Sequence, residues 1–263
     1  FKIIEVNGFK AWELTSNVFV LQNLRFYKEE EENNAEFSKK LAEIAQIYVN
    51  DAFASSHREH ASIVGITKYI PSYAGLRMEK EVEALSKVLQ NPKRPLCVII
   101  GGAKIETKLP LVEKMHGFSD YVLVGGEIAE NDKVLLKVQH EKINGKKSAL
   151  LVADLIESTK DITLKSAENF LQIAQKSQTI VWNGPMGLIE EADNRQGTLV
   201  LAKGLAKLPI GKIVGGGDTL LFLKQENLLN DFSFASTGGG AMLEFLAGIK
   251  LPGLNALAWL LSL

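Results

Sequence analysis

The chain has 263 residues, of which 46% are apolar and 23% charged, a globular composition that excludes a disordered or fibrous protein. Its 30 basic and 31 acidic residues nearly cancel, so no overall field draws the chain to nucleic acid or to a membrane surface. A single cysteine, Cys97, lies in an apolar run, and we expect a buried thiol in a reducing, cytoplasmic compartment. No run reaches the ~18 apolar residues that span a bilayer.

The first 73 residues hold few glycines. A strand is predicted over residues 17–22, followed by an acidic helix start at residues 28–32 and a helix over residues 37–49. The polar stretch 50–62 then carries His, Ser and Asp side chains. We interpret residues 1–73 as one domain. The chain opens on Phe rather than Met, so we expect its natural start to lie elsewhere.

A connecting helix is predicted over residues 75–89. Ser72 stands before it as a candidate cap, and acidic side chains fall in its first turns. Asn91 and Pro92 close it, because the residue before a proline disfavours helix. We therefore assign residues 74–91 to the link between two domains.

We interpret residues 92–263 as the second, nucleotide-binding domain. From Pro95 onward a short apolar run, a glycine cluster and a helical segment follow one another repeatedly. This alternation predicts parallel βαβ units, and the nearly continuous apolar runs predict a sheet that is covered on both faces. The predicted strands cover residues 96–100, 121–124, 149–152, 179–182, 213–214 and 232–235.

Glycine-rich loops follow five of these strands. Parallel strands place such loops at one sheet edge, where α/β proteins bind ligands, and glycine lets backbone N–H groups approach a phosphate. Each loop alone could be an ordinary turn, but together they indicate a nucleotide or phosphate site. Neither a P-loop nor a G-x-G-x-x-G dinucleotide motif is present. The loops contain Gly101–Gly102, Gly125–Gly126, Asn183–Gly184–Pro185, Gly215–Gly216–Gly217 and Gly238–Gly239–Gly240.

Three charged residues stand next to these loops. Lys104 and Lys108 share one helix face after the first loop, where a bound anion would offset their repulsion by the helix dipole; a solvated pair is the alternative. Asp218 follows three glycines and could bind Mg²⁺ beside phosphates, or could instead cap a helix.

The first domain also carries candidate ligands. Arg25 and Arg58 could hold a carboxylate or phosphate through paired hydrogen bonds, or could form surface ion pairs. His57 and His60 lack the further ligands that a zinc site needs.

Several segments, in order along almost the whole chain, resemble phosphoglycerate kinase. The matching segments are residues 22–26, 50–62, 101–104, 182–187, 215–219 and 236–241. The resemblance implies two Rossmann-like parallel-sheet αβα domains joined by a long helix. The N-terminal domain would bind 3-phosphoglycerate or 1,3-bisphosphoglycerate, and the C-terminal domain would bind Mg²⁺ with ADP or ATP. The enzyme would be a monomer with no nucleic-acid or membrane partner.

The resemblance also assigns roles to residues. It implies that Arg25, His57 and Arg58 bind the acidic substrate, and that Lys104, Gly238 and Gly239 act on the transferring phosphate. Asp218 would be the metal ligand. The nucleotide contacts would be Gly102, Lys104, Lys108, Gly125, Gly126, Asn183, Gly184, Pro185, Glu190, Gly216, Gly217, Asp218, Thr219 and Gly240.

The chain departs from the family pattern in three places. The family's opening Asp-x-Asn segment and an early arginine do not precede Phe1, so we expect the N-terminal domain to be incomplete. Glu127 stands where a third glycine is usual, and the chain is shortened after Ala129. Residues 161–166 resemble the family's Asp-Ile-Gly-Pro-Lys-Thr segment, but Thr163 and Leu164 stand where the family has Gly and Pro. A remnant that only binds ADP or ATP is therefore an alternative, whereas a dinucleotide-dependent oxidoreductase lacks its motif.

Overall fold

The computed structural model describes residues 2–102, 105–132, 142–143 and 146–257. The chain forms two compact units. Unit 1 contains Phe1–Val82 and Lys250–Leu263, and unit 2 contains Glu83–Ile249. The boundary falls within helix α3 (Leu76–Gln90), which corresponds to the predicted connecting helix.

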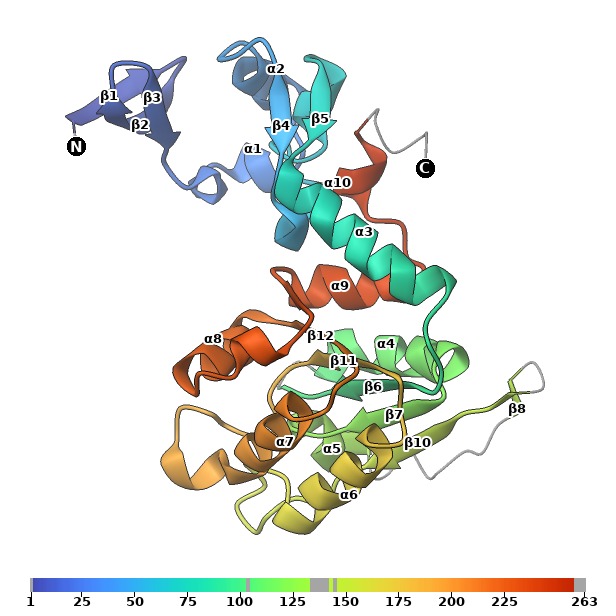
Figure 1. The fold of residues 1–263 in the computed structure, drawn as a ribbon. Coiled ribbons are helices and arrows are strands. Elements are labelled where there is room, and N and C mark those ends of the chain that lie inside the picture. Colours follow the sequence, from blue (N-terminus) through green and yellow to red (C-terminus); the bar gives the residue numbers. More distant parts are fainter. Residues whose placement is uncertain (1, 103–104, 133–141, 144–145, 258–263) are drawn as a thin grey trace. The chain divides into compact units, whose positions relative to one another are not determined.

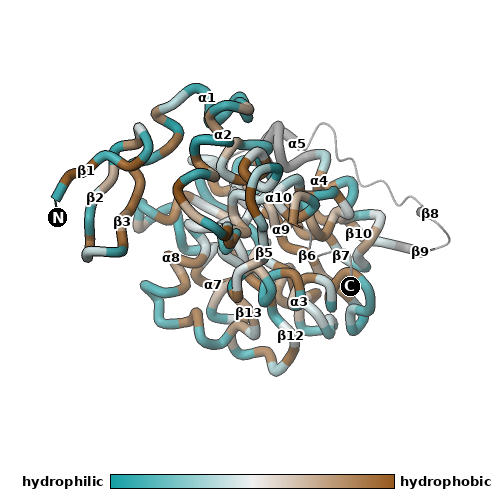
Figure 2. The backbone as a smooth tube through the Cα atoms, turned by 90° about the horizontal axis from the view of Figure 1, so that it is seen from above, coloured by the Kyte–Doolittle hydropathy of each residue, from teal (hydrophilic) through white to brown (hydrophobic). Residues whose placement is uncertain are grey.

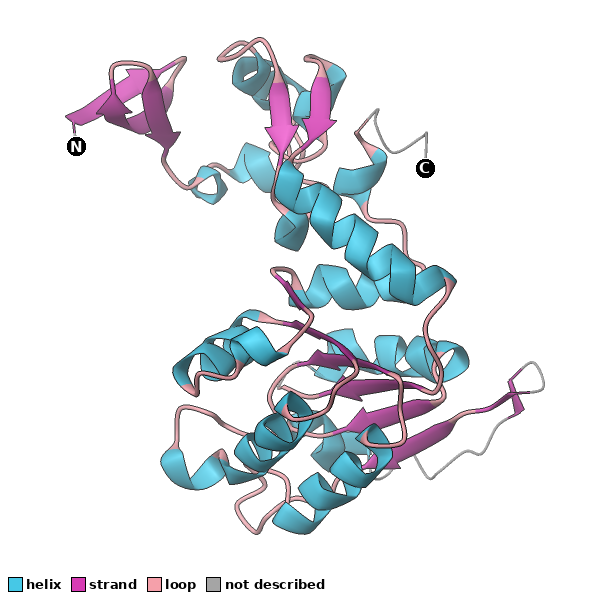
Figure 3. Cartoon of the chain, in the orientation of Figure 1, coloured by secondary structure: helices cyan, strands magenta, loops and turns pink. Residues whose placement is uncertain are grey.

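Unit 2 is built on a six-stranded parallel sheet (Figure 3). Its strand order is β10-β7-β6-β11-β12-β13, so the chain direction across the sheet reverses between β6 and β11. All six predicted strands are confirmed, and so is the α/β fold class. The strands are β6 (Leu96–Ile100), β7 (Tyr121–Val124), β10 (Ala149–Val152), β11 (Thr179–Asn183), β12 (Gly211–Gly215) and β13 (Phe234–Ser236).

Helices cover both faces of this sheet. The helices α6 and α7 pack against each other on one face, and α4 and α9 lie on the other (Figure 1). The helices of unit 2 are α4 (Ile105–Phe118), α5 (Glu127–Asp132), α6 (Leu164–Ala174), α7 (Gln196–Ala206), α8 (Gly217–Gln225) and α9 (Gly239–Leu246). Short elements complete the unit, namely β8 (Lys142–Ile143), β9 (Lys146–Lys147), η4 (Ala192–Asn194) and η5 (Leu229–Asp231).

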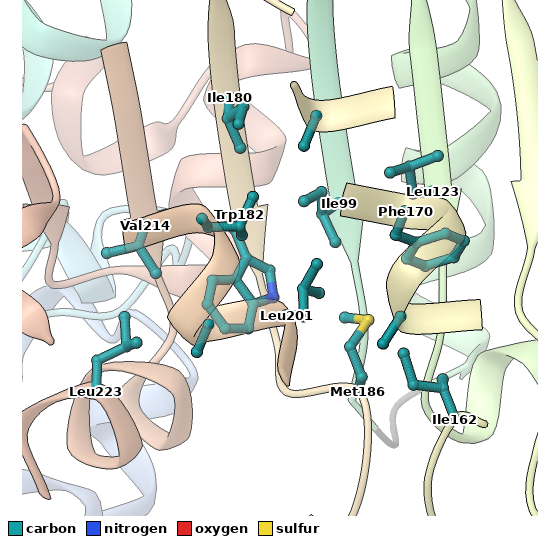
Figure 4. Close-up of a cluster of buried hydrophobic side chains, with 14 of the residues drawn as sticks. Ile99, Leu123, Ile162, Phe170, Ile180, Trp182, Met186, Leu201, Val214 and Leu223 are labelled. Carbon is teal, nitrogen blue, oxygen red and sulfur yellow. The ribbon is translucent and has the colours of Figure 1, made fainter. Parts of the chain in front are cut away.

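The core of unit 2 explains why its strands read as continuous apolar runs. All five residues of β6 and all five of β11 are buried, because both faces of each strand lie under helices. Trp182 fills the space between the sheet and the helices that cover it, beside Leu201 and Met186 (Figure 4). Its indole N–H donates to the Gly184 carbonyl at 2.8 Å, so the buried polar atom is satisfied.

Unit 1 consists of smaller pieces. Three strands form an antiparallel sheet, and β4 and β5 form a separate parallel pair. Its apolar cluster centres on Phe9, Phe37 and Leu41. The elements are β1 (Lys2–Val6), β2 (Phe9–Thr15), β3 (Val18–Leu21), η1 (Leu24–Phe26), α1 (Lys28–Glu31), α2 (Ala35–Ala42), β4 (Tyr48–Asn50), η2 (Phe53–Ser55), η3 (Gly65–Lys68), β5 (Ser72–Ala74) and α10 (Pro252–Asn255).

Two local predictions in unit 1 are wrong. The helix predicted over residues 37–49 ends at Ala42, because residues 48–50 pair with β5 instead. Ser72 does not cap α3: it lies in β5, and its hydroxyl donates to the Ile70 carbonyl. The cap comes from Asp51, whose Oδ1 accepts the Arg77 and Met78 N–H groups at 2.7 and 3.0 Å.

The C-terminal segment differs from the predicted domain limits as well. Residues from Lys250 onward belong to unit 1, whereas the sequence placed them with the second domain. The Gly253 N–H donates to the Ser56 carbonyl at 2.8 Å, and Leu254 is buried. Among the described residues, no helix combines the length and apolar character needed to cross a bilayer.

Candidate functional site

The carboxyl ends of the strands of unit 2 bring the glycine loops to one edge. In the strand register, Asn183 pairs with Ile100 on one side and with Gly215 on the other. Gly215 in turn pairs with Ser236. The loops after β6, β11, β12 and β13 therefore start side by side, as the sequence predicts.

A cavity of about 230 Å³ opens at this edge, where the strand order reverses. Such a switch point is the ligand site expected of an open α/β sheet. The lining residues come from the loops after β6, β7, β10 and β11 and from the first residues of α5 and α8. They are Gly102, Gly126, Glu127, Thr159, Lys160, Pro185, Gly187, Leu188, Ile189, Glu190 and Asp218.

Direct backbone contacts hold the first three loops together. The Gly101 N–H donates to the Asn183 carbonyl at 2.8 Å, and the Gly126 N–H donates to the Met186 carbonyl at 3.1 Å. Gly126 has a φ of +68°, and a Cβ atom there would lie 2.6 Å from the Gly102 nitrogen. Only glycine adopts this φ without strain and leaves room for the Gly102 nitrogen, so the close approach of these loops requires glycine at position 126.

A second junction joins the loops that begin α8 and α9. The Asn183 Nδ2 donates to the Gly239 carbonyl at 2.9 Å, and the Thr219 hydroxyl accepts the Gly184 N–H at 3.1 Å. A Cβ atom on Gly239 would lie 2.7 Å from the Gly216 Cα. The amino ends of α8 and α9 thus lie against each other, and each carries N–H groups that have no partner within the helix, together with a partial positive charge.

The charged groups of the cavity are mostly acidic. Glu127, Glu190 and Asp218 are exposed lining residues. The Lys160 Nζ lies 3.1 Å from the Glu191 Oε1, and the hydrogen bond from Lys160 lowers the pKa of the Glu191 carboxyl. In the part of the chain that the structure describes, no cluster of three or more His, Cys, Asp or Glu side chains could hold a metal ion.

Two buried groups of unit 2 have a raised pKa, the Asp161 carboxyl and the Cys97 thiol. Burial raises the pKa of the Asp161 carboxyl, although the backbone N–H groups of Gly197, Ile162 and Thr198 act in the opposite direction. Burial also raises the pKa of the Cys97 thiol to about 12, as expected for a core cysteine.

The predicted nucleotide residues fall into three positions. Those that line the cavity are Gly102, Gly126, Pro185, Glu190 and Asp218. Those that lie behind it or at the neighbouring helix ends are Gly125, Asn183, Gly184, Gly216, Gly217, Thr219, Gly238, Gly239 and Gly240. Lys104 lies outside the described residues, and Lys108 lies in α4, with its side chain outside what the structure describes.

The sequence missed the wall formed by Thr159 and Lys160. These residues lie within a short turn that is closed by a bridge between Leu155 and Ile162, so no strand-end pattern marks them. Thr159 has a φ of +59°, a conformation that threonine rarely adopts and that no motif in the sequence predicts.

Unit 1 has its own cavity of about 320 Å³, which includes Arg25 and His60. Arg25 is exposed, and the predicted partners His57 and Arg58 do not line this cavity. Glu30, a buried residue of the cavity lining, accepts the Ser62 N–H at 2.9 Å. Glu30 thereby fixes the end of the stretch that carries both histidines.

The sequence of this chain is similar to those of known proteins. The family model "Phosphoglycerate kinase" matches residues 10–160 and 131–249. The phosphoglycerate kinase of Coprothermobacter proteolyticus is 36% identical over 97% of this chain and 73% of its own length. That of Dictyoglomus turgidum is 39% identical over 92% of this chain and 71% of its own length.

Solved structures agree with these matches. The phosphoglycerate kinase of Coxiella burnetii superposes with a TM-score of 0.71 at 35% identity, and that of Pyrococcus horikoshii with 0.72 at 31% identity. Each superposition covers 89% of this chain and 71% of the other. The shared fold and the glycine loops that meet at the sheet edge lead to one conclusion: this chain belongs to the phosphoglycerate kinase family.

Proposed function

We propose that this chain transfers the acyl phosphate of 1,3-bisphosphoglycerate reversibly to ADP, giving 3-phosphoglycerate and ATP, a step of glycolysis. It would be a phosphotransferase with a carboxyl group as acceptor, which is the activity that its relatives' names denote. The observation that carries the proposal is the cavity at the β6–β11 switch point, where three backbone loops meet. Phosphoryl transfer needs mainly such positioning and charge neutralisation.

The nucleotide would occupy this cavity with its nucleoside between the loops and its phosphates towards α8. Pro185 and Glu190 line the cavity, and Gly102 and Gly126 bring bare backbone to it. The amino end of α8 lies at its margin, where N–H groups that have no partner within the helix, and the helix dipole, favour an anion. Lys104 and Lys108 stay predicted phosphate ligands from the family motif.

Asp218 suits a Mg²⁺ ion that arrives with the nucleotide. It supplies one exposed carboxylate at the start of α8, on the lining of the cavity. Mg²⁺ is usually held by one or two carboxylates together with substrate phosphates, so a single protein carboxylate is sufficient. The bound ion would neutralise phosphate charge during transfer.

The acidic three-carbon substrate would bind to unit 1. Arg25 is exposed on the cavity of that unit, and a guanidinium can hold a carboxylate or phosphate with two parallel hydrogen bonds. We propose Arg58 and His57 as further ligands. The amino end of α9 at Gly238–Gly240 would meet the transferring phosphate.

A coupled assay with ATP and 3-phosphoglycerate tests the reaction. We expect turnover by the chain and a loss of about 100-fold or more for Lys104→Ala, since a phosphate-bound cation contributes several kcal/mol to such a transition state. Lys203→Ala, on the exposed side of α7, is the matched control and should keep full turnover. Absence of turnover in the unaltered chain, or full turnover by Lys104→Ala, would contradict the proposal.

The metal role has a separate test. Asp218→Asn should weaken ADP binding in the presence of Mg²⁺ and leave it unchanged in a chelator, because only the metal-bound form uses the carboxylate. Calorimetric titration with ADP measures both. An equal loss under the two conditions would show that Asp218 acts without a metal.

A further inference from the structure

We infer that Asp161 is a positioning residue that holds two walls of the nucleotide cavity in register; this inference rests on the proposed nucleotide site. The carboxylate itself does not line the cavity. It acts through the residues that do.

The two walls come from different loops. Thr159 and Lys160 belong to the loop after β10, and residues 187–190 belong to the loop after β11. One backbone hydrogen bond joins them, from the Leu188 N–H to the Lys160 carbonyl at 2.8 Å. Lys160 is the residue immediately before Asp161, so a shift of Asp161 would move this joint.

Both loops are also anchored to the first turn of α7. The Asp161 Oδ2 accepts the Gly197 N–H at 2.7 Å, while its Oδ1 accepts the Ile162 N–H at 2.9 Å. From the other loop, the Met186 N–H donates to the Thr198 hydroxyl at 3.0 Å. The carboxylate at this helix start satisfies N–H groups that have no partner within the helix. The first turn of α7 therefore fixes one loop relative to the other.

Asp161 also stands directly behind the second wall. It is only 1% exposed, and a Cβ atom on Gly187 would overlap its carboxylate. Gly187 is itself a lining residue of the cavity, whereas Asp161 is not. The cavity wall is thus one backbone thick at this point, and the carboxylate sets where that backbone lies.

Asp161→Asn is the direct test. The amide keeps the size of the side chain but offers one acceptor oxygen and turns an NH₂ group towards backbone donors. We expect ADP to bind about tenfold more weakly, the size of effect that a lost buried hydrogen bond to a charged group produces. In the coupled assay, the KM for ATP should rise and the KM for 3-phosphoglycerate should not change. Asp193→Asn, an exposed carboxylate in η4, is the control and should change neither.

Amide hydrogen exchange separates this role from general destabilisation. We expect faster exchange at residues 186–190 in the Asp161→Asn protein without nucleotide, and unchanged exchange in β6. A lower Tm with normal ADP affinity and normal exchange at residues 186–190 would overturn the inference. If the unaltered chain fails to bind ADP, the proposed function fails, whereas the exchange comparison still decides whether Asp161 fixes the wall.

A second pair of variants covers the case in which Asp161→Asn does not fold. Thr198→Val removes the acceptor of the Met186 N–H at the same anchor and should also weaken ADP binding. Thr198→Ser keeps the hydroxyl and should retain the affinity. Equal ADP affinity in the two variants would overturn the inference.

Discussion

Units 1 and 2 are both α/β structures, but they bury their strands very differently. In unit 2 the strand β6 is wholly buried, and one sheet carries six parallel strands. In unit 1 the strand β3 is apolar along its length (Figure 2), yet three of its four residues are exposed. Trp182 is completely buried in unit 2, whereas Trp12 in unit 1 is 38% exposed. A continuous two-sided core gives unit 2 a rigid edge on which backbone loops can be placed accurately.

This difference bears on function. A nucleotide site made of backbone N–H groups tolerates little movement, so it requires a scaffold such as the sheet of unit 2. Arg25 of unit 1 is the substrate ligand that we propose, and because its long side chain could adjust to a bound anion, its position would demand less of the scaffold. The predictions below test whether the two units differ as their cores suggest.

The largest contrast is expected in the reactivity of Cys97. Burial raises the pKa of its thiol to about 12 from 9.0, so its thiolate fraction at pH 8 is about a thousandfold below that of an exposed thiol. Labelling with iodoacetamide should therefore be negligible in the folded chain and rapid in denaturant. The native rate should keep rising with pH up to about 12. Rapid labelling of folded protein at pH 8 would show that the unit 2 core opens.

Tryptophan replacement compares the two cores directly. Trp182→Ala should cost unit 2 about 3–5 kcal/mol of unfolding free energy, because it leaves a large cavity in packed surroundings. Trp12→Ala should cost less than about 1 kcal/mol, since this side chain is partly exposed. Urea unfolding followed by circular dichroism measures both. Equal losses would mean that exposure does not distinguish the units.

Glycine replacement tests the contact between loops. Gly126→Ala adds a strained φ, about 1–2 kcal/mol, and a clash with the Gly102 nitrogen, so ADP affinity should fall by about tenfold or more. Gly248→Ala carries the same φ strain, since its φ is +71°, but meets no atom within 4 Å. It should lose stability alone. A similar affinity in both variants would refute the role of the loop contact.

The smallest effect is expected at the start of α3. Asp51→Ala removes the acceptor of the Arg77 and Met78 N–H groups and should lower stability by about 0.5–2 kcal/mol. Thermal unfolding measures this loss. Ser72 is the cap that the sequence predicts, but Ser72→Ala should lower the unfolding temperature less than Asp51→Ala does. A larger effect of Ser72→Ala would instead support Ser72 as the cap of α3.

The sequence predicts the structure of unit 2 better than that of unit 1. The apolar strands and glycine clusters of unit 2 are patterns of neighbouring residues in the sequence. Because the strands pair in parallel, the glycine loops that follow them necessarily lie at one edge of the sheet. The failures lie where a distant residue decides. Asp51 caps a helix that starts 25 residues later, and residues 48–50 leave their helical pattern to pair with β5. The wall at Thr159 and Lys160 was missed for the same reason, because it is defined by its contact with Leu188.

Hydrogen exchange with and without Mg²⁺-ADP tests the central claim most directly. We predict that nucleotide slows exchange at the loops that form the rim of unit 2, namely residues 101–102, 125–127, 183–190 and 216–219, and leaves residues 24–30 of unit 1 unchanged. Unchanged exchange along this rim at saturating nucleotide, or protection confined to unit 1, would contradict the assignment of the nucleotide site.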